Sequence, residues 1–141
     1  LELDPAEMEK RNIHLQKKYA EIEENEVRFE ELHCEDSEYL IVAFGSCARI
    51  AQKAMEMARE EGIKVGLLRP ITLWPFPSKA IAARAAQVKG ILTVELNAGQ
   101  MVEDVRLAVE CKVPVEHFGR LGGIVPDPDE VITALKEKLI K

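Results

Sequence analysis

Short apolar runs, separated by segments with helical spacing, dominate the chain after residue 39. Residues 39–44 (YLIVAF), 64–68 (KVGLL) and 91–96 (ILTVEL) are such runs, and turn residues bound them. A strand that is apolar on both faces is typical of a sheet that is covered on both sides. The alternation of these runs with helices therefore predicts a three-layer α/β/α domain around a mostly parallel sheet.

The intervening segments place small and apolar side chains at helical spacing. A helix is expected over about 47–61, with further helices after Pro77, near 100–110 and after Asp127. Two weaker strands are also expected. Residues 27–32 (VRFEEL) resemble an edge strand, because charged side chains interrupt the apolar positions and discourage further pairing, and a last short strand is expected at 114–118.

The first part of the chain predicts one long, charged helix over residues 6–25. Asp4 suits its N-cap and Pro5 its first turn. Two placements are open: a surface helix lying across the domain, or an arm that reaches a partner chain. The expected division is a helix or linker at 1–26 and an α/β domain at 27–141. The narrow apolar stripe of this helix consists of Met8, Leu15, Tyr19 and Ile22.

Length and charge exclude several classes of protein. The 141 residues suffice for one domain with a core, and the net charge of −6 argues against a nucleic-acid surface. No apolar run approaches the roughly 20 residues that a membrane span needs. The sequence starts at Leu1, which indicates a fragment or a processed product.

The three cysteines, Cys34, Cys47 and Cys111, are scattered and form no C-x-x-C pair. This pattern indicates a reducing, cytoplasmic location and argues against an iron–sulfur cluster or structural zinc within the chain. No metal site is expected.

A proline-rich segment, Lys64–Pro77 (KVGLLRPITLWPFP), carries the only Trp of the chain. Proline restricts φ and removes a hydrogen-bond donor, so a rigid, irregular loop is expected where the strand ends at Arg69 and Pro70. Arg69, Trp74 and Phe76 are candidates for a contact with another domain or subunit, because aromatic residues and Arg are enriched in such contacts.

The loops at the C-terminal ends of the strands are the place to look for ligand binding, because parallel α/β sheets bind ligands there. They could hold an anion through backbone N–H groups or a guanidinium. The structural alternatives are a tight turn with Ser46 capping a helix, and a salt bridge from Arg120. The candidate residues are Gly45, Ser46, Asn97, Gly99, Arg120 and Gly122.

No catalytic residue is expected. Cys47 begins a helix but has no histidine near it in sequence to act as a base. Glu95, at the end of a buried strand, is expected to accept hydrogen bonds from loop N–H groups, because no second carboxylate or histidine accompanies it in sequence. His117 is expected to be structural.

Four segments together resemble the C-terminal part of the α subunit of 2-oxoacid:ferredoxin oxidoreductases, of the 2-oxoglutarate and 2-oxoisovalerate type. They are LRPITLWPFP (Leu68–Pro77), VELNAGQMVEDVRLAV (Val94–Val109), GRLGGIVPDPDE (Gly119–Glu130) and AFGSCARIAQKAM (Ala43–Met55). The resemblance implies a transketolase C-terminal-domain-like fold: a five-stranded sheet in the order 1-3-2-4-5, with strand 1 antiparallel. It also implies CoA-dependent oxidative decarboxylation of a 2-oxoacid to an acyl-CoA, with ferredoxin as electron acceptor.

In that family thiamine diphosphate with magnesium and iron–sulfur clusters carry the chemistry. The chain has neither a GDG…N fingerprint nor a cysteine cluster, so the resemblance implies that these cofactors lie on other domains or subunits. The first hypothesis is therefore a subunit domain that serves assembly within a hetero-oligomer. The second is a stand-alone α/β module that binds an anion or CoA. A third, a relative among transketolases or 2-oxoacid dehydrogenase β subunits, fits the LWPFP and GRLGG segments less well.

Overall fold

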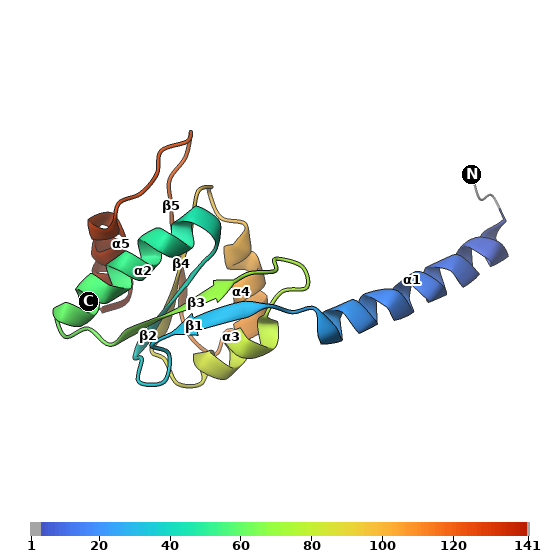
Figure 1. Ribbon diagram of the computed structural model, residues 1–141, viewed down its shortest axis with the longest axis horizontal. Helices are drawn as coiled ribbons and strands as arrows, with labels where there is room; N and C mark the ends of the chain where they lie inside the picture. The colour runs from blue at the N-terminus through green and yellow to red at the C-terminus, as the bar shows by residue number, and fades with distance from the viewer. Residues whose placement is uncertain (1–3, 141) are drawn as a thin grey trace.

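The computed structural model describes residues 4–140, which form one five-stranded sheet between helices and one helix that stands apart (Figure 1). The strands are β1 (Phe29–Leu32), β2 (Tyr39–Ala43), β3 (Val65–Pro70), β4 (Gly90–Glu95) and β5 (Val115–Gly119). The helices are α1 (Pro5–Asn25), α2 (Gly45–Glu60), α3 (Ser78–Ala85), α4 (Met101–Val109) and α5 (Pro128–Leu135), which continues as the π-helical turn η1 (Lys136–Ile140).

The sheet has the order β1-β3-β2-β4-β5, which confirms the expected topology. β2, β3, β4 and β5 are parallel, and β1 alone is antiparallel, to β3. The parallel crossovers place the ends of β2, β4 and β5 at one edge of the sheet. This edge carries the loops that the sequence predicts as ligand sites.

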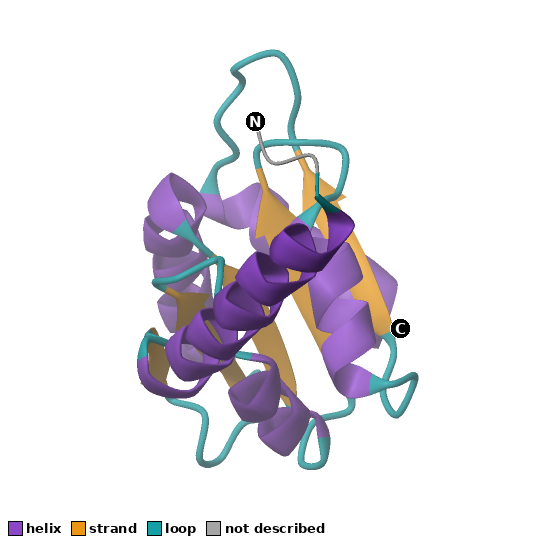
Figure 2. Cartoon of the chain, turned by 90° about the vertical axis from the view of Figure 1, so that its right-hand side faces the viewer, coloured by secondary structure: helices purple, strands orange, loops and turns teal. Residues whose placement is uncertain are grey.

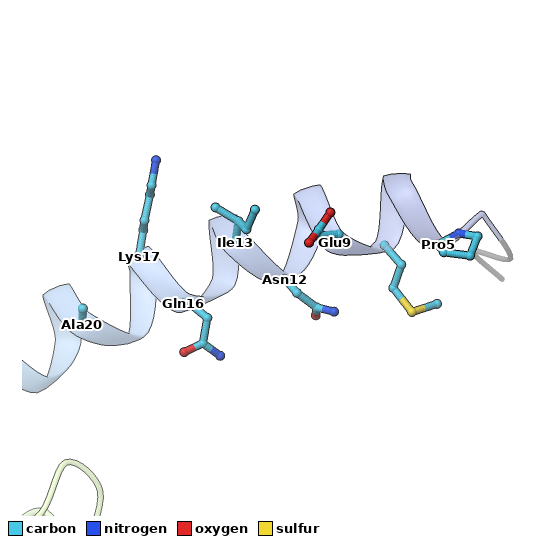
Figure 3. Close-up of a pocket in the computed structure, with 8 residues that line it drawn as sticks. Pro5, Glu9, Asn12, Ile13, Gln16, Lys17 and Ala20 are labelled. Atoms are coloured by element: carbon cyan, nitrogen blue, oxygen red, sulfur yellow. The ribbon is translucent and has the colours of Figure 1, made fainter.

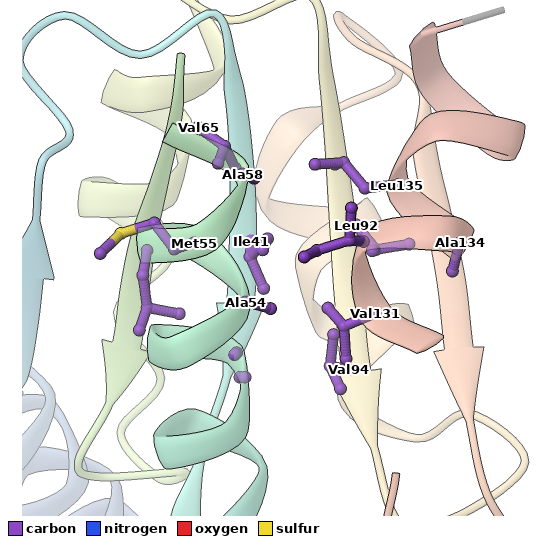
Figure 4. Packing of buried hydrophobic residues seen from close by; sticks show 14 of the residues in the cluster. Ile41, Ala54, Met55, Ala58, Val65, Leu92, Val94, Val131, Ala134 and Leu135 are labelled. Carbon is purple, nitrogen blue, oxygen red and sulfur yellow. The ribbon is translucent and has the colours of Figure 1, made fainter. Parts of the chain in front are cut away.

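Two apolar clusters fill the space on the two sides of the sheet. Ile41 and Leu92 face α2 and α5, where they pack with Met55 and Leu135 (Figure 4). On the opposite side Leu40 belongs to the cluster of α3 and α4. Every residue of β4 is buried, as expected for a strand that is covered on both faces.

β3 runs to Pro70, two residues beyond the expected strand end. Its pairing with β2 stops at Leu68, and Pro70 lies opposite Phe29 on the edge strand β1. Only one side of this position faces a neighbouring strand, so the missing N–H of proline is tolerated. α2 similarly starts at Gly45 instead of Cys47.

Helix α1 projects away from the α/β body, and none of its residues is buried (Figures 1 and 2). Asp4 caps it as expected, because its Oδ1 accepts a hydrogen bond from the N–H of Ala6 at 2.9 Å. The expectation of a helix lying across the domain is thus wrong, since no residue of α1 is buried and the helix extends away from the body. That this arm reaches a partner stays a prediction.

None of the helices among residues 4–140 combines the length and the apolar character needed to cross a membrane.

Candidate interaction site

The proline-rich loop after β3 is fixed to the start of β1 by Thr72. The Thr72 hydroxyl oxygen accepts a hydrogen bond from the N–H of Arg28 at 3.0 Å and donates one to the carbonyl of Pro75 at 2.8 Å. The N–H groups of Ile71 and Thr72 both donate to the carbonyl of Arg28, at 2.9 and 3.1 Å. These bonds close the loop without regular structure, as the prolines require.

The two aromatic residues of this loop have different roles. Phe76 is half-buried and packs against the cluster between the sheet, α3 and α4. Trp74 is 55% exposed, and its ring makes an edge contact with the ring of Tyr19 on α1, at 5.7 Å between centroids. Phe76 therefore anchors the loop, and Trp74 is presented at the surface. The other candidate, Arg69, pairs with Glu30 of β1 at 3.2 Å.

A groove of about 890 Å³ separates the C-terminal part of α1 from this loop. Its walls combine aromatic rings and prolines with the carboxylates of Glu23 and Glu24 on α1. The lining residues are Ala20, Glu23, Glu24, Val27, Phe29, Trp74, Pro75, Phe76, Pro77, Ser78, Lys79 and Ala80.

A shallower surface of about 680 Å³ continues along α1 from Ala20 toward Pro5 (Figure 3). It is mostly apolar because Met8 and Ile13, which are 43% and 52% exposed, contribute to it. Ala20 lines both hollows, so one face of the arm leads into the groove beside Trp74.

At the C-terminal edge of the sheet, the start of α2 carries Gly45 and Ser46. Gly45 has a φ of +57°, which favours glycine, and a Cβ there would meet nothing within 4 Å. Phe44 occupies the N-cap position, and no side chain caps the helix, so Ser46 lies inside the first turn and does not cap it. No side chain of the described residues caps the first N–H groups of α2.

The start of α4 differs, because the buried carboxylate of Glu95 occupies it. Glu95 accepts hydrogen bonds from the N–H groups of Met101 and Val102 at 2.8 and 3.1 Å, and from the Asn97 amide at 3.2 Å. The Asn97 oxygen in turn accepts from the N–H of Gly99 at 2.7 Å. The expected structural role of Glu95 is confirmed, and one potential anion site is filled by the protein itself.

His117 of β5 completes this buried cluster. Its Nδ1 lies 3.1 Å from the Thr93 hydroxyl and 3.5 Å from a Glu95 oxygen, and its Nε2 lies 3.3 Å from the carbonyl of Asn97. All three contacts hold the ends of β4 and β5 together, which is a structural role for His117.

The loop after β5 brings Arg120 to the same edge of the sheet, but a carboxylate already engages it. The guanidinium pairs with Glu130 at 2.9 Å, and Glu130 also closes the capping box of α5 with Asp127. Gly122 lies beyond it, with a φ of +64°. An anion at Arg120 would compete with Glu130, so the anion site at these loops stays a prediction. The neighbouring exposed apolar residues are Leu121, Ile124 and Val125.

The two buried cysteines are unsuited to nucleophilic catalysis or metal binding. Burial raises the pKa of Cys34 to about 11 and also raises the pKa of Cys47. Cys111 is exposed. Among residues 4–140 no group of three potential metal ligands is found. The buried carboxylate of Glu95 is saturated by protein donors, so the described residues fit neither an iron–sulfur cluster nor the magnesium of thiamine diphosphate.

The sheet order, with β1 alone antiparallel, and the helices on both faces define a three-layer α/β/α domain. Residues 37–131 match the model for pyruvate:ferredoxin oxidoreductase core domain II, and the chain belongs to this family. It is 48% identical over 135 residues to the ketoisovalerate oxidoreductase subunit VorB of Methanothermobacter thermautotrophicus, and it is 32% identical over 101 residues to the 2-oxoglutarate synthase subunit KorA of Methanothermobacter marburgensis.

These alignments cover 96% and 72% of this chain but 38% and 27% of the two relatives, so the chain spans well under half of their length. The solved 2-oxoglutarate:ferredoxin oxidoreductase of Magnetococcus marinus superimposes with a TM-score of 0.81 at 25% identity, over 96% of this chain and 24% of that chain. A split-gene transketolase shares the fold, with a TM-score of 0.68 at 21% identity, over 80% of this chain and 41% of its own.

Sequence reasoning did not identify the α1 side of the groove. Glu23 and Glu24 look like ordinary solvated charges, and Phe29 looks like a residue of an edge strand. One signal was the short connection between a long charged helix and the edge strand, and the structure places the start of that strand opposite Pro70, where the proline loop begins. That connection, residues 26–28, brings α1 beside Trp74.

Proposed function

We propose that this chain is the part of a 2-oxoacid:ferredoxin oxidoreductase subunit that holds the enzyme together, while other domains carry the chemistry. The reaction would be CoA-dependent oxidative decarboxylation of a 2-oxoacid with reduction of ferredoxin. The observation that carries this proposal is the 48% identity to a ketoisovalerate oxidoreductase subunit over 96% of the chain, which includes most of α1.

The character of the surface supports a role in assembly. Exposed apolar side chains gather at α1, at the proline loop and at the loop after β5, whereas the buried polar cluster around Glu95 is fully engaged. Large exposed apolar surfaces commonly mark protein contacts. Thiamine diphosphate, magnesium and iron–sulfur clusters would be bound elsewhere in the complex, and the free, unpaired cysteines agree with assembly in the cytoplasm.

The test is purification of a tagged form of this protein from its native cells, followed by assay of dye reduction with CoA and a panel of 2-oxoacids. The expected result is a coloured complex that contains further subunits and oxidises one 2-oxoacid best. The same 141-residue chain produced alone should fold and show no turnover. An inactive, colourless protein without partners from native cells would overturn the proposal, as would turnover by the chain alone.

A second candidate, a domain that binds CoA or another anion, is favoured by one observation: the N–H groups at the start of α2 have no side-chain cap. Calorimetry with CoA and with inorganic phosphate would test it. Binding tighter than about 1 mM that is lost in Arg120→Ala would favour this function.

A further inference from the structure

Helix α1 is not stabilised by the body of the protein. It has 21 residues, none of them buried, and its ring contact with the body is that between Tyr19 and Trp74. Most helical stability in proteins comes from tertiary packing of an apolar face, and α1 lacks such packing. Packing of the exposed face that contains Met8 and Ile13 against another surface would therefore stabilise the helix.

The charges at the end of that face define the chemistry of this partner. Glu23 and Glu24 line the groove, and neither carboxylate takes part in any of the ion pairs or side-chain hydrogen bonds described for residues 4–140. The single cation among the lining residues is Lys79. Two exposed aromatic residues line the same groove: Trp74, 55% exposed, and Phe29, 40% exposed.

A groove lined by both carboxylates and aromatic rings favours a cationic side chain with an apolar stem. An Arg or Lys can pair with a carboxylate while its charge lies over an aromatic ring and its methylene groups cover apolar surface. A neutral apolar segment would leave both carboxylates unpaired, and an acidic segment would be repelled. The groove thus selects for a basic side chain beside an apolar one.

We propose that this groove binds a segment of a different polypeptide of the oxidoreductase, and that this segment presents Arg or Lys next to a large apolar side chain. The segment continues along the Met8 and Ile13 face of α1, because Ala20 lines both hollows. The inference rests on the proposed function, since it takes the partner from the same complex. It deepens that function by stating where the partner binds and which residue types it uses.

Photo-crosslinking in the complex purified from native cells tests the proposal. Trp74 is replaced by p-benzoylphenylalanine, and crosslinked peptides are identified by mass spectrometry. The control places the same group at Leu107 of α4, which is 76% exposed and remote from the groove. The expected product at position 74 is a peptide from another subunit that contains Arg or Lys beside an apolar residue, with no such product at position 107.

Three outcomes would overturn the inference. They are no crosslink at position 74, a crosslink to a second copy of this chain, and a crosslink to a segment without a cationic residue. Dye reduction by the same complex is measured in parallel. An active complex without the crosslink refutes the inference alone, whereas absence of an active complex refutes the proposed function.

Charge removal supplies a second measurement that does not depend on crosslinking. The double variant Glu23→Gln, Glu24→Gln should retain the fold, because both side chains are exposed, and should weaken retention of the chain in the complex by about tenfold. The difference in retention between the double variant and the unmodified chain should shrink as NaCl is added, because salt screens the ion pairs of the unmodified complex. The matched control is Glu103→Gln with Asp104→Asn on α4. Equal retention of the two double variants would contradict the proposed pairing.

Discussion

Replacing Glu95 by glutamine should destabilise the fold strongly, although the two side chains have nearly the same size and shape. One Glu95 oxygen accepts from Met101 N–H and Asn97, and the other accepts from Val102 N–H. Glutamine keeps one oxygen but turns the other acceptor into an NH₂ donor. That donor would face a buried backbone N–H, which then has no partner.

The expected loss is about 2 to 4 kcal/mol in the free energy of unfolding. An unsatisfied buried donor costs about 1 to 3 kcal/mol. Removal of a negative charge from a partly buried helix N-terminus adds about 0.3 to 2 kcal/mol. The assay is urea unfolding of the 141-residue chain, followed by circular dichroism. The comparison is valid if the slope of the unfolding free energy against urea concentration is the same for the variant and the unmodified chain.

Glu103→Gln is the matched control, because Glu103 is an exposed carboxylate in the first turn of the same helix. It loses the interaction with the helix dipole but leaves no buried donor unpaired, so it should cost less than about 1 kcal/mol. A Glu95→Gln variant as stable as Glu103→Gln would refute the assigned role of the buried carboxylate.

Three further changes have defined outcomes. Glu31→Gln should lower stability by about 1 to 2 kcal/mol near pH 7, because Arg84 binds both Glu31 oxygens at 2.9 and 2.7 Å and holds the pKa of Glu31 below its usual 4.5. In urea midpoints measured from pH 7 to 3, the difference from the unmodified chain should shrink once the pH falls below 4.5 and vanish below the lowered pKa of the folded state. Gly119→Ala should destabilise by more than about 3 kcal/mol in the same assay, since its Cβ would lie 2.1 Å from a backbone oxygen of the loop after β4. Iodoacetamide at pH 8 should label Cys111 first, detected by mass spectrometry, because burial raises the pKa of Cys34 to about 11.

Each of these predictions has an internal control. Glu30→Gln breaks the exposed pair with Arg69 and should cost well under about 1 kcal/mol. Gly122→Ala meets open space and should cost only the strain of its left-handed backbone, about 1 to 2 kcal/mol. Equal labelling of all cysteines in the folded chain would contradict the burial of Cys34 and Cys47.

The sheet could be predicted from the sequence because its signals are local. The run YLIVA is apolar at every position, and the structure buries Leu40–Ala43 completely. The order of the strands came from the resemblance to a family, since periodicity does not specify which strands pair. Glu95 was predictable as well, because a carboxylate at the end of a buried strand must find donors nearby.

The placement of α1 could not be predicted in the same way. Met8, Leu15, Tyr19 and Ile22 form the stripe that either a packed helix or a projecting arm would carry. A packed helix and a projecting arm differ only in whether the stripe contacts another surface of the protein, and the local spacing of apolar residues does not specify such contacts. The pairing of Arg120 with Glu130 has a similar origin, because it depends on how the loop after β5 folds back toward α5.

The antiparallel strand β1 has a consequence for how copies of this domain can associate. It closes one margin of the sheet with four residues, two of them glutamates, and one of these is bound to Arg84 and the other to Arg69. A short, charged margin is a poor template for strand addition by another chain. Contacts at this end of the molecule must therefore use side chains instead of the backbone, which disfavours pairing of β1 with the sheet of another copy.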